Sequence, residues 1–166
     1  MGGTISCTSS AGKGSTFTVE LPVVPTSAPA TGQESATVGT PAGLRVLVAE
    51  DNLTNQRVIV GLLRKIGIEA TVVPNGMDAV EACQQERFDL VLMDCQMPTL
   101  DGYGATRQIL KNLGAAAPPI VALTAHALES DRAECLAAGM CAYLTKPIVL
   151  EQLRRVVAEW CGLTAH

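Results

Sequence analysis

Five short apolar runs alternate with five helix-like segments between residues 44 and 164, and this alternation is the strongest constraint on the fold. The runs cover residues 44–49, 69–73, 89–93, 120–124 and 142–145. The first and third are nearly continuous in apolar residues, as is typical of strands buried on both faces of a sheet. Strict alternation of strand and helix predicts an α/β fold: a doubly wound parallel sheet with helices on both faces and right-handed crossovers.

The helices are predicted over residues 52–66, 77–86, 103–113 and 130–138 and after Pro147. The first is predicted to place one apolar stripe toward the sheet, made of Val58, Ile59, Leu62, Leu63 and Ile66. The last is predicted to do the same with Leu150, Leu153, Val156, Val157 and Trp160.

The first 43 residues have a different character. Residues 1–22 alternate apolar and polar side chains around Gly12-Lys13-Gly14, which predicts a hairpin. A lone hairpin is only marginally stable in water, so we expect it to be poorly ordered. Residues 23–43 are rich in Pro, Ser, Thr, Ala and Gly, a composition typical of a flexible linker. The chain is therefore predicted to divide into a hairpin, a linker and one domain at 44–164.

Composition excludes several classes of protein. Hydrophobic residues make up 48% of the chain, which is enough for a packed core and excludes wholesale disorder. No apolar run reaches the roughly 18 residues of a membrane span, and the opening residues lack the pattern of an export signal. With a net charge of −4 and no cluster of Lys and Arg, nucleic acid is not an expected partner. We therefore expect a cytoplasmic fragment without direct membrane contact.

Six cysteines contain no CxxC pair, and only two histidines accompany them. A zinc site and a disulfide framework are therefore both disfavoured, and reduced thiols that fill the core are the simpler interpretation.

Chemistry-bearing residues follow four of the five predicted strands. Because the carboxyl ends of parallel strands meet at one edge of a sheet, these side chains should converge there: Glu50, Asp51, Asp94, Thr124 and Lys146. Three carboxylates in one place repel one another and raise one another's pKa, a cost that a divalent cation such as Mg²⁺ removes. A hydroxyl and an ammonium nearby suit the remaining oxygens of a phosphoryl group. Each residue alone has an ordinary explanation as a cap or surface charge, but their combination predicts a site for Mg²⁺ and phosphoryl transfer.

Three stretches, VLVAEDNLTNQ, LVLMDCQMPTLDG and IVALTAHALESDRAECLAAGMCAYLTKPI, resemble the receiver domain of two-component signalling over about 120 residues. The resemblance implies a flavodoxin-like sheet of strand order 2-1-3-4-5 with five helices. It implies that Asp94 is the phosphoacceptor. Glu50, Asp51, Asp94 and the backbone carbonyl of Gln96 would hold Mg²⁺. Glu50 stands where many members have Asp, and its longer side chain is expected to reach the metal through water.

The resemblance also implies a set of switching residues. Thr124 would close on the phosphoryl group, Lys146 would pair with it, and Tyr143 would swing inward on activation. The side chains of Gln96 and His126 would tune dephosphorylation. The Lys146–Pro147 bond is predicted to be cis, because the chain must reverse sharply after the lysine and a cis bond costs least before proline.

The opening segment resembles the end of a histidine-kinase ATP-binding domain, with Gly12-Lys13-Gly14-Ser15-Thr16 as its second glycine box. Together the two resemblances imply the tail of a hybrid sensor histidine kinase, and they leave open whether the parent protein is anchored in the inner membrane. The fragment lacks a complete kinase core, so it would catalyse only its own phosphorylation and dephosphorylation. The alternative is a stand-alone single-domain response regulator that acts through protein–protein interaction.

The implied reaction moves a phosphoryl group from the phosphohistidine of a histidine-kinase domain to Asp94, with relay to a histidine-phosphotransfer partner. Two other classes fit less well. A haloacid-dehalogenase-like phosphatase needs a second Asp two residues after the nucleophile, where this chain has Gln96. A dinucleotide-binding module needs a GxGxxG turn, where this chain has Glu50-Asp51-Asn52-Leu53. A scaffold that has lost phosphorylation is a third alternative.

Overall fold

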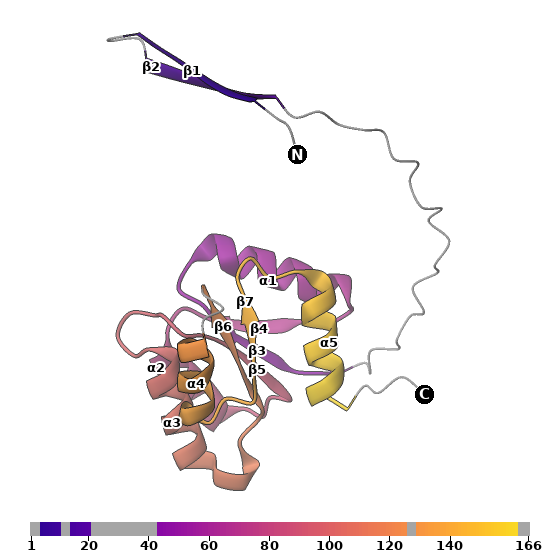
Figure 1. The fold of residues 1–166 in the computed structure, drawn as a ribbon. Coiled ribbons are helices and arrows are strands. Elements are labelled where there is room, and N and C mark those ends of the chain that lie inside the picture. Colours follow the sequence, from indigo (N-terminus) through magenta and orange to yellow (C-terminus); the bar gives the residue numbers. More distant parts are fainter. Residues whose placement is uncertain (1–3, 11–13, 21–42, 126–128, 163–166) are drawn as a thin grey trace. The chain divides into compact units, whose positions relative to one another are not determined.

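The computed structural model describes residues 4–10, 14–20, 43–125 and 129–162, which fall into two units, Met1–Ala36 and Thr37–His166. In the first unit, strand β1 (Thr4–Ser10) pairs antiparallel with β2 (Gly14–Glu20), where the alternation of side chains predicts a hairpin (Figure 1). The predicted linker, except for residue 43, and His126 lie outside the described residues.

The second unit contains a parallel sheet of order β4-β3-β5-β6-β7. Its strands are β3 (Val46–Ala49), β4 (Ala70–Val73), β5 (Leu90–Asp94), β6 (Ile120–Thr124) and β7 (Ala142–Thr145). Numbered within this unit, the order is 2-1-3-4-5, so the predicted fold class and strand order are confirmed. The three inner strands are completely buried, whereas the two edge strands are partly exposed.

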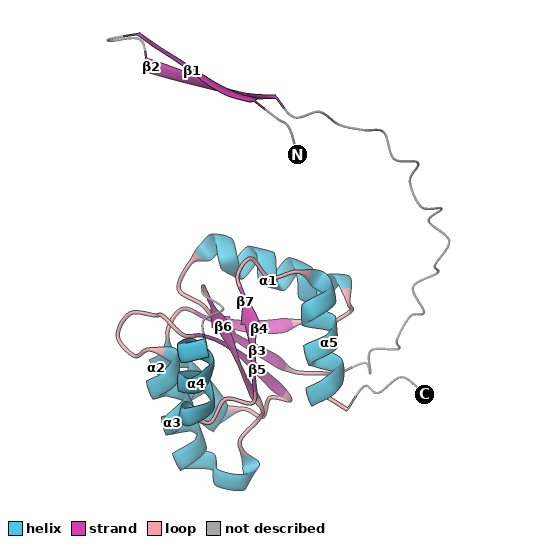
Figure 2. Cartoon of the chain, in the orientation of Figure 1, coloured by secondary structure: helices cyan, strands magenta, loops and turns pink. Residues whose placement is uncertain are grey.

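Five α-helices cover the two faces of this sheet: α1 (Leu53–Lys65), α2 (Gly76–Gln85), α3 (Gly102–Leu113), α4 (Glu129–Ala138) and α5 (Leu150–Trp160). Helices α1 and α5 pack on one face, and α2, α3 and α4 pack on the other (Figures 1 and 2). Successive strand residues alternate between the two core layers. Leu47 faces α2 and α3, whereas Val46 and Val48 face α1 and α5.

Polar residues at the strand ends also begin the helices. The Oδ1 of Asn52 accepts hydrogen bonds from the backbone N–H groups of Thr54 and Asn55 and so caps α1. Asn75 caps α2 through the N–H of Asp78, and Asp101 caps α3. Each cap satisfies an N–H that has no partner inside the helix, so each helix begins directly above the carboxyl edge of the sheet.

Some expectations need correction. Val58 was predicted to lie in the buried stripe of α1 but is 49% exposed, because Ile59 and Leu63 are the residues that face the sheet. Trp160, at the last position of α5, is 36% exposed rather than buried in the apolar face. A 3-10 turn at Gly114–Ala116, which no pattern predicted, extends α3 toward β6. The Lys146–Pro147 peptide is cis, as predicted.

No helix in the described part of the chain has the length and apolar character that crossing a bilayer requires.

Candidate functional site

The carboxyl edge of the sheet brings three acidic residues together. Glu50 follows β3 and is fully buried, Asp94 ends β5 and is 6% exposed, and Asp51 is exposed. One carboxylate oxygen from each lies within 4.8 Å of the others. The structure thus places side by side the three carboxylates that the strand-end pattern predicts to converge.

Lys146 joins two of these carboxylates. Its Nζ lies 2.6 Å from Oδ2 of Asp94 and 2.7 Å from Oε2 of Glu50. The lysine reaches this position because it follows β7, and its backbone N–H donates to the carbonyl of Thr124 on the neighbouring strand. Burial alone would lower the pKa of the Lys146 amine, but its close contacts with the negative charges of Asp94 and Glu50 outweigh burial, so the pKa is raised.

The environment of Asp94 favours its neutral form. Burial raises the pKa of its carboxyl group, and the charge of Glu50 adds a smaller increase. Hydrogen bonds from Lys146 and from the backbone N–H of Gln96 lower the pKa, but they offset only part of this increase. The sequence pattern attributes the increase to repulsion between carboxylates, whereas in the structure the loss of hydration is the larger cause.

These residues fit a hard divalent cation. The Oε2 atom of Glu50 is buried and accepts no hydrogen bond of good geometry within the described residues, since its contact with Lys146 is an ion pair only. Three carboxylates facing one ammonium leave a surplus of negative charge and free oxygen ligands, which is the ligand type that Mg²⁺ prefers. The backbone carbonyl of Gln96 remains a predicted ligand.

Two amides in the first turns of α1 hold Glu50, and neither was predicted. The Nδ2 of Asn55 donates to Oε1 of Glu50 at 2.8 Å, and the Nε2 of Gln56 donates to its backbone carbonyl at 2.7 Å. The signal in the sequence is a run of amide side chains directly after the acidic pair, in EDNLTNQ. Helical geometry returns these amides to the strand end from which the chain has just come.

A close backbone contact holds the loop after Asp94. Gly102 donates its N–H to the carbonyl of Cys95, and a Cβ at Gly102 would lie 2.1 Å from the carbonyl oxygen of Asp94. Only glycine allows the start of α3 to approach the end of β5 this closely.

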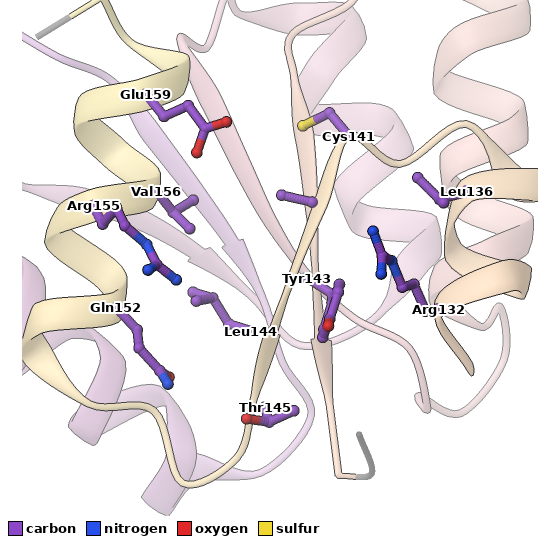
Figure 3. Close-up of a pocket in the computed structure, with 11 residues that line it drawn as sticks. Arg132, Leu136, Cys141, Tyr143, Leu144, Thr145, Gln152, Arg155, Val156 and Glu159 are labelled. Atoms are coloured by element: carbon purple, nitrogen blue, oxygen red, sulfur yellow. The ribbon is translucent and has the colours of Figure 1, made fainter. Parts of the chain in front are cut away.

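Thr124 and Tyr143 lie on neighbouring strands but in different environments. Thr124 is buried at the end of β6, the strand that pairs with β5, which ends in Asp94. Tyr143, on β7, is 39% exposed, and the guanidinium of Arg132 lies 6.0 Å from its ring centroid. Figure 3 shows Tyr143 in a shallow pocket between α4 and α5, with Arg132 and Leu136 on one side and Arg155 on the other. In this structure the tyrosine therefore points outward, away from the core.

Five cysteines in the described residues are free thiols, and the Sγ atoms of Cys95 and Cys135 lie 3.9 Å apart in one of the buried clusters. Burial raises the pKa of Cys95 to about 12, so this thiol remains protonated and acts as a core residue.

Comparison with known proteins agrees with this geometry. The family model of the response regulator receiver domain matches residues 46–158. The sensor protein GacS of Pseudomonas syringae pv. syringae is 48% identical over 122 residues, covering 72% of this chain and 14% of that protein. Hybrid signal transduction histidine kinase K of Dictyostelium discoideum is 40% identical over 121 residues, covering 69% of this chain and 10% of that protein. This chain thus spans a small part of these relatives.

Solved structures show the same domain. The receiver domain of sensor histidine kinase PA1611 from Pseudomonas aeruginosa PAO1, with a magnesium ion coordinated in its active-site cleft, is 46% identical. It has a TM-score of 0.68 and covers 73% of this chain and 99% of that one. A Saccharomyces cerevisiae receiver domain, crystallised with a histidine phosphotransfer signalling protein, is 35% identical and has a TM-score of 0.68. The match covers 74% of this chain and 92% of the yeast chain. With the sheet order, the strand-end chemistry and the family match in agreement, the chain belongs to the response regulator receiver domains of two-component phosphorelay signalling.

Proposed function

We propose that this domain takes a phosphoryl group from a phosphohistidine onto Asp94, with Mg²⁺ bound, and passes it on to a histidine-phosphotransfer partner. One observation carries the proposal. Lys146 reaches across from β7 to Asp94 and Glu50, at an edge where three carboxylates leave oxygen ligands for a cation. Most of the work of such a site is positioning and charge neutralisation, because the donor N–P bond is already reactive.

The transfer itself is a single displacement. A carboxylate oxygen of Asp94 attacks the phosphorus, the O–P bond forms as the N–P bond breaks, and the electron pair of that bond stays on the imidazole nitrogen. Lys146 already touches Oδ2 of Asp94 and is placed to neutralise a phosphoryl oxygen there. Mg²⁺ held by Glu50, Asp51, Asp94 and the carbonyl of Gln96 would neutralise charge on the other side.

Activation would follow from the new charge. Phosphorylation of a side chain adds roughly −1.5 to −2 charges for phosphate esters, and an acyl phosphate should be similar. The hydroxyl of Thr124 would move to donate to the phosphoryl oxygens, and the space that it leaves would admit Tyr143, which now points outward. The surface between α4 and α5 would change shape as a result.

Several findings support a phosphorelay partner. The relatives of this domain include hybrid kinases, and one similar receiver domain was crystallised with a histidine phosphotransfer signalling protein. An apolar groove runs beside Lys146, lined by Asn55, Val58, Ile59, Lys146, Pro147 and Ile148. The exposed side chain of Val58 is explained if this groove receives a helix of the phosphohistidine protein.

The parent protein is proposed to be a hybrid sensor histidine kinase acting in the cytoplasm. The hairpin at 1–22 would be the end of its ATP-binding domain and residues 23–43 its linker to the receiver domain at 44–164. A stand-alone single-domain response regulator is the alternative. The two differ in whether the phosphorylated domain transfers its phosphoryl group to a purified histidine-phosphotransfer protein or holds it until hydrolysis.

Incubation with acetyl phosphate and Mg²⁺ tests the acceptor. Intact-mass measurement should show one added phosphate, which hydroxylamine removes and which EDTA prevents from forming. Asp94→Asn should abolish the added mass, because the amide oxygen is a poor nucleophile. Asp89→Asn, just before the opposite end of the same strand, is the matched control and should be phosphorylated like the wild type. Phosphate uptake by Asp94→Asn at the wild-type rate would contradict the assignment.

A further inference from the structure

The carboxylate of Glu50 is fixed in place by a neutral amide. Its side chain is 0% exposed, and Oε1 accepts the Nδ2 of Asn55 at 2.8 Å. Within the described residues, Oε1 accepts one further hydrogen bond, from the backbone N–H of Asn52 at 3.4 Å. The second oxygen, Oε2, is left facing Lys146. The contact with Asn55 therefore decides which way the two oxygens of this buried group point.

Asn55 is itself held rigidly. It lies in the first turn of α1, where its backbone N–H donates to Oδ1 of the cap residue Asn52 at 3.2 Å. The next residue, Gln56, also returns an amide to Glu50, but only to the backbone carbonyl. The side chain of Asn55 thus reaches the carboxylate from a fixed helix end, whereas Gln56 fixes the backbone behind it.

We propose that Asn55 is a positioning residue for the metal and phosphoryl site, acting through the side chain of Glu50. This inference rests on the proposed function. A Glu side chain has one more rotatable bond than the Asp that many receiver domains carry here, so it has more orientations to lose. The amide of Asn55 selects the orientation in which Oε1 is satisfied and Oε2 faces the cation site.

The chemistry of the amide suits this role. Asn donates a hydrogen bond without adding charge. A carboxylate at position 55 would repel the three acidic groups already present, and an ammonium would compete with both the cation and Lys146 for Glu50. A neutral donor orients the carboxylate and leaves its charge available to the metal.

The test is a double-mutant cycle on the full chain, with Mg²⁺ affinity as the main measurement. Mg²⁺ is titrated against the wild type, Asn55→Ala, Glu50→Asp and the double variant, followed by NMR shifts. Partners behind a metal ligand usually contribute about 10- to 100-fold to metal affinity, so Asn55→Ala should weaken Mg²⁺ binding about 10-fold or more. In the Glu50→Asp background the same change should have little effect, because the shorter side chain does not reach the amide.

Two further measurements separate positioning from a general structural effect. Phosphorylation of Asn55→Ala by acetyl phosphate should be slow at low Mg²⁺ and recover at saturating Mg²⁺. Gln56→Ala is the matched control, because it also removes an amide from the same helix. Its effect on Mg²⁺ affinity should be the same with Glu or with Asp at position 50. If Asn55→Ala fails to fold, Asn55→Leu, which is of similar size and has no hydrogen-bond donor or charge, should bind Mg²⁺ at least 10-fold more weakly than the wild type.

Two outcomes overturn the inference. One is an unchanged Mg²⁺ affinity in Asn55→Ala, or in Asn55→Leu if that variant is needed. The other is a loss of the same factor in the Glu50→Asp background, which would mean that Asn55 does not act through this carboxylate. Failure of the proposed function is recognised separately. In that case the Mg²⁺ affinities of the four proteins still show the coupling between positions 50 and 55, but the wild type takes no phosphoryl group from acetyl phosphate.

Discussion

At the scale of single residues, the main feature is that the ionisable side chain of Asp94 is buried. Burial raises the pKa of its carboxyl group more than its hydrogen bonds with Lys146 and Gln96 lower it. The folded domain therefore holds a proton on Asp94 more tightly than the unfolded chain does, and the ionised form costs stability. A bound cation or a neutral side chain would remove that cost.

A substitution at position 94 tests whether burial of the ionised carboxylate lowers the stability of the folded domain. In metal-free solution Asp94→Asn should be more stable than the wild type at pH 7, because it keeps an acceptor for Lys146 and removes a buried charge. A group whose folded pKa is raised contributes stability below its ordinary pKa, about 3.9, and loses that contribution as pH rises through the folded value. The difference between the two proteins should therefore shrink as pH falls toward 4.

Urea unfolding in EDTA between pH 4 and pH 7.5 measures this difference. Added Mg²⁺ should stabilise the wild type more than the variant, which lacks one carboxylate ligand. A variant that is less stable than the wild type at pH 7, or a difference that does not change with pH, would contradict the description of Asp94.

At the scale of elements, the site depends on how helices begin. Helix α1 starts with Asn52 as its cap and carries Asn55 and Gln56 back to the end of β3. Helix α3 starts at Gly102, against the backbone of Asp94. The strand ends carry the charged groups of the site, and the first turns of these two helices contact two of those ends.

Alanine substitutions at two glycines in these helices are expected to change the stability of the domain in opposite directions. Gly102→Ala should destabilise the domain by about 1–3 kcal/mol, because the added methyl meets backbone that has little freedom to move. It should also slow phosphorylation, since the atom it meets is the carbonyl of Asp94. Gly61→Ala, inside α1 with nothing within 4 Å of the added Cβ, should instead stabilise the domain by about 0.5–1 kcal/mol.

Thermal and urea unfolding of both glycine variants, with acetyl phosphate kinetics, check these outcomes. Equal stability of Gly102→Ala and the wild type would show that the loop after β5 relaxes freely, against the close contact described here.

At the scale of the whole molecule, the chain divides into two units, Met1–Ala36 and Thr37–His166. Every residue in the two buried clusters of the receiver domain lies between positions 46 and 157. Among the residues whose burial the structure describes, none of the cluster members comes from β1 or β2. The receiver domain therefore has what it needs to fold without the first unit.

Removal of residues 1–36 tests this division. The shortened protein should keep the melting temperature and the phosphorylation rate of the full chain, because its core and its site are intact. Calorimetry and the acetyl phosphate assay on both proteins give the comparison. A lower melting temperature after truncation would mean that the hairpin stabilises the receiver domain.

Much of this protein follows from the sequence by itself. The alternation of apolar runs and helical stripes was sufficient to predict the parallel sheet, and β6 and β7 begin and end at the predicted residues. The sequence also predicted that four charged side chains meet, because the carboxyl ends of parallel strands lie at one edge of the sheet. These are Glu50, Asp51, Asp94 and Lys146. Both inferences depend on short-range periodicity and on a rule of topology, and these do not require knowledge of how side chains pack.

Tertiary structure decided the contacts between these elements. Lys146 and Asp94 are 52 positions apart in the chain, and only packing of β7 beside β6 sets which carboxylates the lysine reaches. The rotation of α1 against the sheet buries Ile59, exposes Val58 and aims Asn55 at Glu50. Periodicity defines the apolar face of a helix but leaves its rotation within about one residue undetermined. That rotation is set by close packing across the whole core.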